Sequence, residues 1–335
     1  MPEYKVSLDA AGQRLDKYLR RVLPDVPVSA LYKLIRTKKI RVNGARAEEA
    51  QLLKPGDAVT IRDQALQAPS AKPEVRPPPR PARRMFEILH EDGHILVCSK
   101  PAGLAIHPGS GITEATLVDQ IRDYIGPIPE GEFKPAPAHR LDRETSGVVV
   151  VAKTRQAIVK LSEIFTEGSA KKTYLALVKG RVEKEGVIDL PLSEHQQTGA
   201  NKAERGVNMQ RALTRFRLIG QAKEAALVEV EIETGRTHQI RRHFAAIGHP
   251  VIGDAKYGDF PFNRRAKAEW GARRMFLHSA RLGIAHPITG QQMTFRAPVP
   301  PELCEVLDHL AIELPNKFAR EVSPPGGAGH DSKSV

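Results

Sequence analysis

The sequence predicts an α+β protein of two domains, the larger with a mainly antiparallel sheet. After residue 85, short strand-like segments alternate with long connections and a few helices, which is typical of this class. Residues 64–84 hold six prolines and five basic residues, so they cannot build a core and favour an extended linker. A chain of 335 residues is long enough for two domains with sizeable cores.

Composition points to the cytosol. No apolar run approaches the length of a membrane span, and the first ten residues lack the basic-then-apolar pattern of a signal peptide. The two cysteines, Cys98 and Cys304, form no CxxC pair, which argues against a disulfide framework and a cysteine zinc site. We therefore expect a cytoplasmic protein with no membrane partner.

Positive charge is concentrated at the N-terminus. The chain carries a net charge of +12; residues 1–63 contribute +5, residues 64–84 contribute +4, and the remaining 251 residues contribute only +3. Such placement favours binding to a polyanion such as nucleic acid. Improved solubility alone is the alternative explanation.

The first 63 residues predict two helices followed by short strands. Residues 9–23 carry leucines at helical spacing between basic residues, and Ser29 is a suitable N-cap for a second basic helix. Residues 40–42 predict a strand ending at an Asn-Gly turn, and residues 58–62 predict a last strand after a Pro-Gly-Asp turn.

This arrangement resembles the small RNA-binding domain first seen in a ribosomal protein of the small subunit, the S-four type, over residues 1–63. The resemblance implies that a basic helical face holds structured RNA through phosphate contacts, which position a protein without reading base sequence. The residues expected to make these contacts are Arg14, Lys33, Arg36, Lys38 and Arg41. An unrelated domain with a basic helix pair is the alternative.

The second domain is predicted to begin near Met85 and to end at residue 315. Buried strands are predicted at residues 95–98, 148–151, 174–178, 213–218 and 226–233. Helices are predicted at residues 115–125, 154–167 and 237–247. Residues 316–335 are rich in glycine, serine, proline and charge and predict a disordered tail.

A charged loop directly before the apolar strand 148–151 is the first candidate site. The loop, residues 139–147, reads HRLDRETSG, and loops that enter rigid strands often carry catalytic groups. Asp142 lies between Arg140 and Arg143, and a carboxylate beside cations stays ionised, which suits a nucleophile or a charge stabiliser.

The nine residues resemble the active-site motif of the RluA-type family of RNA pseudouridine synthases, HRLD-x-x-T/S-S/T-G. Other segments match that family's motifs in the same order: Lys100–Gly103, Lys171–Tyr174, Gly235–Arg241, Gly248–Pro250 and Gly253–Gly258. The resemblance covers roughly residues 85–300. It implies the pseudouridine-synthase fold, a bent mixed sheet with the active cleft across it.

The resemblance implies that a uridine is isomerised to pseudouridine, a reaction that needs no cofactor and no metal. Asp142 would be the essential carboxylate, Arg241 its ion-pair partner, and Tyr174 the residue that stacks on the base and assists proton removal. Ile240 would pack beside the uracil, and Arg140 would fill the gap left by the flipped base or contact a phosphate. His139 is predicted at the substrate side of the loop, which it helps to fix.

Some assignments stay open. Arg242 replaces the apolar residue usual in the family and blurs which arginine pairs with Asp142. His238 and His243 are predicted to be structural, with His238 as a hydrogen-bonding residue at the helix start. The segments Gly253–Asn263 and Leu277–Leu282 favour a branch that modifies large-subunit ribosomal RNA.

The alternatives come from different classes. They are a sister branch that modifies other uridines of the same RNA, a non-catalytic RNA-binding ribosome-assembly factor, and a metal-dependent nuclease. Intact Asp142, Tyr174 and Arg241 argue against the assembly factor, and the lack of a clustered carboxylate pair argues against the nuclease. We expect the protein to be a monomer.

Overall fold

The structure is a computed structural model. It describes residues 3–6, 12–23, 26, 28–61, 85–107, 114–129, 132–193 and 209–318. The chain divides into two compact units, Met1–Arg80 and Pro81–Val335. The predicted linker at residues 64–84 lies outside the described residues. No helix within the described ranges is long and apolar enough to cross a membrane.

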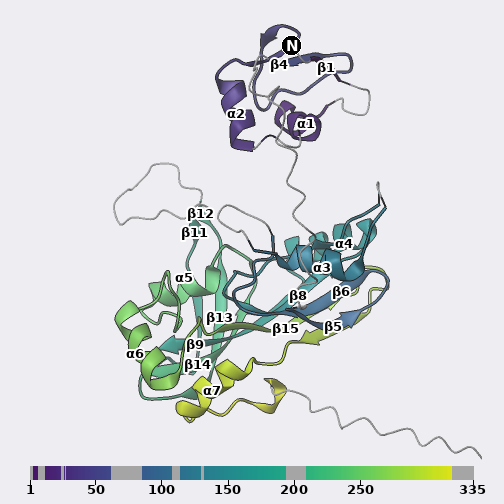
Figure 1. Cartoon of the computed structure of the whole chain (residues 1–335). Coiled ribbons are helices and arrows are strands. Elements are labelled where there is room, and N and C mark those ends of the chain that lie inside the picture. The colour runs from purple at the N-terminus through teal and green to yellow at the C-terminus, as the bar shows by residue number, and fades with distance from the viewer. Residues whose placement is uncertain are drawn as a thin grey trace, which may run out of the picture. The chain divides into compact units, whose positions relative to one another are not determined.

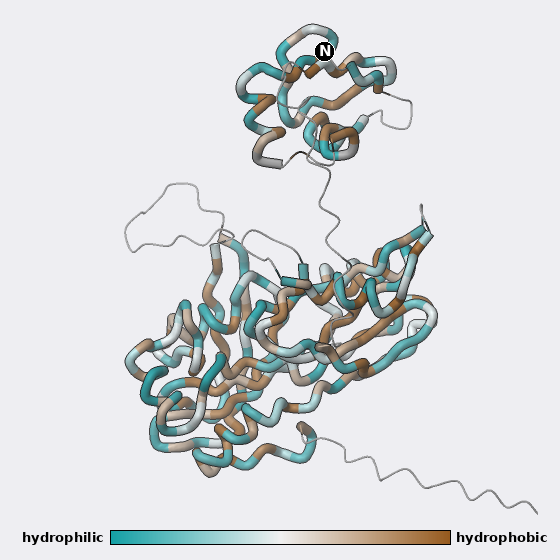
Figure 2. Tube along the Cα trace, viewed as in Figure 1, coloured by the Kyte–Doolittle hydropathy of each residue, from teal (hydrophilic) through white to brown (hydrophobic). Residues whose placement is uncertain are grey.

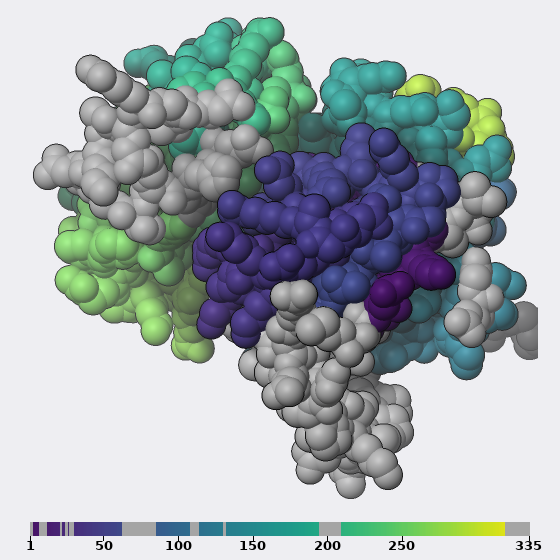
Figure 3. Space-filling view, turned by 90° about the horizontal axis from the view of Figure 1, so that it is seen from above, coloured from purple at the N-terminus to yellow at the C-terminus, as the bar shows by residue number. Residues whose placement is uncertain are grey.

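The N-terminal unit has two helices and a four-stranded sheet in the order β1-β4-β2-β3 (Figure 1). Figure 3 shows the surface of this unit in purple and blue. Its elements are β1 (Glu3–Lys5), α1 (Leu15–Val22), α2 (Val28–Arg36), β2 (Ile40–Val42), β3 (Ala45–Arg46) and β4 (Ala58–Ile61). The Asn-Gly pair behaves as predicted: Asn43 and Gly44 have φ of 50° and 75° and join β2 to β3. The second helix starts at Val28, two residues before the start that an N-cap at Ser29 predicts, so Ser29 lies inside it.

The second unit is built on a ten-stranded mixed sheet (Figure 1). Its strands are β5 (Glu87–Glu91), β6 (Ile95–Lys100), β7 (Ala136–Pro137), β8 (Ser146–Ala152), β9 (Lys171–Lys179), β10 (Glu185–Asp189), β13 (Leu213–Gln221), β14 (Ala225–Ile232), β15 (Leu277–Ala285) and β16 (Gln292–Arg296). The main order is β10-β13-β14-β9-β15-β8-β6-β5, with β16 beside β15 and β7 beside β8. The predicted α+β class with a mainly antiparallel mixed sheet is confirmed.

The strand β15 joins the two halves of this sheet. On one side it pairs antiparallel with β9. On the other side its first residues pair parallel with β8, and its last residues pair antiparallel with β16. The loop at residues 139–147 leads into β8 at this junction, so the sheet itself fixes where the loop ends.

Helices cover both faces of the large sheet. Along β8, Val149 and Val151 face the core shared with α3 (Leu117–Ile125) and α5 (Gln239–Ala246), while Val148 and Val150 face α4 (Arg155–Thr166). The same face as α4 also carries α6 (Phe260–Trp270) and α7 (Pro301–His309). Figure 2 shows the resulting hydrophobic stretches along the strands. A short pair, β11 (Leu192–Ser193) and β12 (Met209–Gln210), stands apart from the sheet.

The ordered chain continues beyond the predicted start of the tail. Asn316–Phe318 form a 3-10 helix, with Phe318 buried and Arg281 over its ring. Lys317 pairs with buried Glu229 at 2.7 Å. Composition placed these three residues in the tail because it cannot detect a single buried aromatic anchor. Residues 319–335 lie outside the described residues.

Candidate active site

A buried lysine fixes the backbone of the loop that carries Asp142. Lys100 is fully buried at the end of β6. Its ammonium donates to the carbonyl oxygens of Pro101, Leu104 and Arg143 at 2.9, 2.8 and 3.0 Å. Three donors satisfied by three backbone acceptors lock the residue next to Asp142 in place. Lys100, from the Lys100–Gly103 motif, thus supports the loop that contains the HRLDRETSG motif.

The end of the loop requires a glycine. Gly147 has φ +120°, and a Cβ added there would lie 2.1 Å from the carbonyl oxygen of Ser279 on β15. Beside it, the hydroxyl of Ser146 and Nδ1 of buried His278 are hydrogen-bonded at 2.9 Å, and Arg274 donates to the same hydroxyl. These contacts set the close parallel approach of β8 and β15, and hence the position of the loop.

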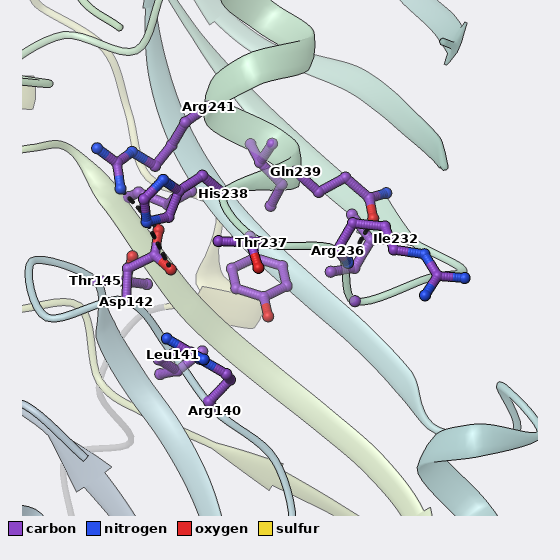
Figure 4. A pocket seen from close by; sticks show the side chains of 14 residues that line it. Arg140, Leu141, Asp142, Thr145, Ile232, Arg236, Thr237, His238, Gln239 and Arg241 are labelled. Carbon is purple, nitrogen blue, oxygen red and sulfur yellow. Dashed lines mark hydrogen bonds and ion pairs between the residues drawn. The ribbon is translucent and has the colours of Figure 1, made fainter. Parts of the chain in front are cut away.

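Arg241 lies between two carboxylates (Figure 4). Its Nη1 donates to Asp142 at 2.9 Å, while Nε and Nη2 donate to the two oxygens of Asp254 at 2.7 and 2.9 Å. Burial opposes the guanidinium charge, but the bonds to Asp254 and Asp142 outweigh it and raise the pKa of Arg241. The bidentate pair with Asp254 orients the guanidinium, which presents its remaining nitrogen to Asp142.

Asp254 is a site residue that the sequence did not single out. It is fully buried, and its Oδ1 also accepts from the backbone nitrogens of Lys256 and Tyr257. Burial alone would raise the pKa of Asp254, but these bonds and Arg241 lower it. The signal available in the sequence was the Gly-Asp pair of the 253–258 segment, a turn-forming block shortly after the arginine-bearing helix.

The predicted arginine is the one that pairs with Asp142. The neighbouring Arg242 turns to β11, where it donates to the carbonyl and the hydroxyl of Ser193, both at 3.1 Å. Buried His243 bonds Thr214 and the carbonyl of Leu190. Both residues therefore fasten α5 to the sheet, and the structural role predicted for His243 is observed.

A cleft opens beside Asp142. Its lining residues come from the loop at 139–147, from β9, β14 and β15, and from the start of α5 with the segment before it: Arg140, Leu141, Asp142, Thr145, Tyr174, Ile232, Gly235, Arg236, Thr237, His238, Gln239, Ile240, Arg241 and Leu277. The structure thus brings Arg140, Tyr174 and Ile240 to the same cleft as the ion pair. In the described part of the chain, no cluster of three or more His, Cys, Asp or Glu side chains is placed to hold a metal ion.

Tyr174 is buried in the floor of the cleft. Its hydroxyl is hydrogen-bonded to the side chain of Ser279. Burial and the nearby charge of Asp142 raise the pKa of Tyr174, so the hydroxyl stays protonated at neutral pH. The ring is available for stacking, but a protonated phenol is a poor base.

His139 is not brought to the cleft in the described structure. Its Nε2 accepts a hydrogen bond from the backbone nitrogen of Val150 at 3.1 Å, and its ring stacks on that of Phe165 with the ring centroids 4.6 Å apart. Burial lowers the pKa of His139 to about 3, so the ring is a neutral acceptor. The loop-fixing role is observed, whereas the predicted contact with substrate has no geometric support.

Four of the five predicted RNA-binding residues are exposed in the N-terminal unit, and the fifth, Arg41, is half-buried. Lys33, Arg36 and Lys38 are exposed on and just after α2. Arg14 is also exposed but pairs with Asp16 at 3.1 Å, and Arg41 donates to the carbonyl of Gly44. Intramolecular partners do not prevent phosphate contacts, but they reduce the freedom of these two side chains to reach for them.

A sequence model described as RNA pseudouridylate synthase matches residues 94–246, and one described as S4 domain matches residues 13–59. The Escherichia coli protein named ribosomal large subunit pseudouridine synthase C is 38% identical over 311 residues, which cover 91% of this chain and 95% of that protein. The chain belongs to the RNA pseudouridylate synthase family.

A second relative and a solved structure belong to the same family. The synthase C of Vibrio vulnificus is 37% identical over 90% of this chain and 94% of that protein. The human RNA pseudouridylate synthase domain containing 4 has a TM-score of 0.55 at 26% identity, over 69% of this chain and 95% of that one. The predicted family, its fold and the resemblance to the C branch are confirmed, and the chain is an enzyme of the pseudouridine synthase class.

Proposed function

We propose that this protein converts specific uridines of large-subunit ribosomal RNA to pseudouridine in the cytoplasm, with Asp142 as the essential carboxylate. The observation that supports this most is the Asp142 carboxylate at the cleft, 2.9 Å from a guanidinium that Asp254 orients. We infer the RNA substrate from the names of the relatives, which describe pseudouridine synthases of the large ribosomal subunit.

The geometry suits a carboxylate that must stay ionised. Arg241 donates one hydrogen bond to Oδ2 of Asp142, and Oδ1 receives no bond from this arginine and lies 3.7 Å from Nε2 of His238. That oxygen can attack the sugar C1′, attack the uracil ring or assist glycal formation, and these three routes remain open. Since the reaction is an isomerisation, it needs no electron donor and no group donor.

Other cleft residues have roles in holding the base. A target uridine must leave the RNA stack to reach Asp142. We propose that Tyr174 stacks on the flipped uracil, a contribution of about 1–3 kcal/mol, and that Ile240 packs beside it. Arg140, exposed at the rim, would occupy the gap in the RNA or contact a phosphate.

A direct test is to map pseudouridines across ribosomal RNA in cells with and without this protein. We expect specific large-subunit sites to remain unmodified uridine in cells that lack it. The purified protein should convert these uridines to pseudouridine in vitro. Restoration would exclude the assembly-factor alternative, and the sites themselves would separate the two sister branches. An unchanged pseudouridine map and no activity on the transcript would contradict the proposal.

The N-terminal cations are expected to control affinity rather than chemistry. Replacing Lys33, Arg36 and Lys38 by glutamine removes three exposed charges. The slope of log affinity against log salt should fall by about 0.7–0.9 for each lost phosphate contact. Turnover on saturating short RNA should persist because the candidate active site lies in the second unit.

Matched controls are available on exposed helix positions of the second unit: Arg155, Arg264 and Lys267. Replacing these three by glutamine removes the same charge. If both triple variants have the same salt slope, the N-terminal basic face makes no privileged contact with RNA, and its proposed role is lost.

A further inference from the structure

His238 adopts a backbone conformation that is uncommon for a residue with a side chain. It lies at the start of α5 with φ 54° and ψ 30°, the left-handed region that L side chains rarely occupy. Within the described residues its ring makes no hydrogen bond that caps the helix. The hydrogen bond predicted for His238 at the helix start is instead made to the hydroxyl of Tyr257. Residues in unusual backbone conformations of this kind cluster at functional sites.

The strained backbone turns the imidazole into the cleft beside Asp142 (Figure 4). Nε2 lies 3.7 Å from Oδ1 of Asp142, and Nδ1 is 3.1 Å from the hydroxyl of Tyr257. The Tyr257 ring meets the imidazole edge-on, and the guanidinium of Arg241 lies over the same tyrosine ring. One ring nitrogen thus lies at the Tyr257 hydroxyl, and the other lies beside Asp142 in the lining of the cleft.

The imidazole of His238 and the carboxylate of Asp142 are two neighbouring proton acceptors in the lining of the cleft. Burial lowers the pKa of His238; Asp142 and Asp254 act against this, and Arg241 and Lys256 act with it. A neutral imidazole can take a proton and return it. Tyr174 stays protonated, and Arg241 is held as a cation by its two carboxylates.

The chemistry of the isomerisation requires such a group. Once the N1–C1′ bond has broken and the C5–C1′ bond has formed, C5 still carries its hydrogen and N1 lacks one. The C5–H bond must break, and its electron pair must restore the C5=C6 double bond while N1 gains a proton. One proton leaves and one arrives, so a single base can balance the step without another reactant.

We propose that His238 is a catalytic residue that accepts the C5 proton of the rearranged uracil and delivers a proton to N1. This inference rests on the proposed function. It assigns Tyr257 as the positioning residue that holds Nδ1, and it leaves bond cleavage and re-formation to Asp142. The division of labour predicts that His238 matters only after the new carbon–carbon bond exists.

The variant His238→Gly suits the test because glycine accepts the left-handed conformation without strain. Thermal unfolding should show that it folds. With a saturating RNA carrying one target uridine, single-turnover pseudouridine formation should fall by about 10²- to 10⁴-fold, the usual contribution of general acid–base catalysis. Added imidazole should restore part of the rate, which a purely structural loss would not allow.

A second substrate separates the proton step from the earlier ones. With 5-fluorouridine at the target position, C5 carries fluorine, so no proton leaves C5 after rearrangement. Consumption of this RNA by His238→Gly should stay within about threefold of wild type, since the affected step is bypassed. The exposed His309, on α7, provides the control His309→Gln, which should behave as wild type with both RNAs.

The outcomes are distinguishable. Wild-type turnover of uridine by His238→Gly would overturn the proposal and return the proton step to Asp142. Equal slowing on both RNAs without rescue by imidazole would also overturn it, because His238 would then act in binding or cleavage. If the wild-type protein itself forms no pseudouridine, the proposed function fails, whatever the variant does.

Discussion

Replacing Asp142 by asparagine is expected to abolish pseudouridine formation while the protein stays folded and still binds RNA. The amide keeps the shape of the carboxylate but removes the charge and the nucleophilic oxygen. Arg241 retains its bidentate partner Asp254, so no buried charge is left alone. The measurements are single-turnover pseudouridine formation, RNA affinity and thermal unfolding of Asp142→Asn.

The same loop offers a matched control. Glu144 lies two residues further on with half of its side chain exposed, and Glu144→Gln removes an equal charge outside the cleft lining. It should keep wild-type activity. Turnover of Asp142→Asn within about tenfold of wild type, a barrier change of only about 1.4 kcal/mol, would remove Asp142 from the chemistry.

Replacing Asp254 by asparagine is expected to lower both stability and activity. The change leaves the buried Arg241 guanidinium without its bidentate carboxylate, and breaking such a pair costs about 3–5 kcal/mol. Each kcal/mol corresponds to a fall of about 2–4 °C in Tm for a domain of this size. Activity should fall because the guanidinium loses the orientation that presents Nη1 to Asp142.

The stability loss should depend on pH. Folding lowers the pKa of Asp254 below its ordinary value of 3.8, so its contribution is fully present above that value and is lost as pH falls through the folded pKa. The gap in Tm between wild type and Asp254→Asn should therefore be constant near neutral pH and narrow in acid. Asp308→Asn, at an exposed position of α7, should show no gap. A gap of similar size for both variants would mean that Asp254 has no special role.

The sequence predicted those elements whose hydrophobic pattern is local. The β-branched run at residues 148–151 lies in β8. The helices predicted at residues 115–125, 154–167 and 237–247 correspond to α3, α4 and α5. The pairing of Arg241 with Asp142, implied by the resemblance, is present in the structure. In each case the hydrophobic pattern or the motif lies in the residues that form the element or the ion pair.

Elements stabilised by distant partners could not be predicted in this way. The central strand β15 includes the buried polar residues His278 and Ser279, which break the pattern of a buried strand. His278 is tolerated because Ser146 and the carbonyl of Ala297 satisfy its nitrogens. The contacts of Asp254, and the left-handed backbone of His238 beside Asp142, were not predicted for the same reason, since only the folded chain shows them.

The junction between β8 and β15 also constrains how the enzyme can be made. Ser146 and His278 are 132 residues apart, so the loop that carries Asp142 is anchored to a strand synthesised much later. Contacts of such long sequence separation form slowly and after local structure. A ribosome-bound chain that ends before β15 lacks this anchor, however well its helices have formed. We expect catalytic competence to appear abruptly, once the chain beyond β15 has left the ribosome.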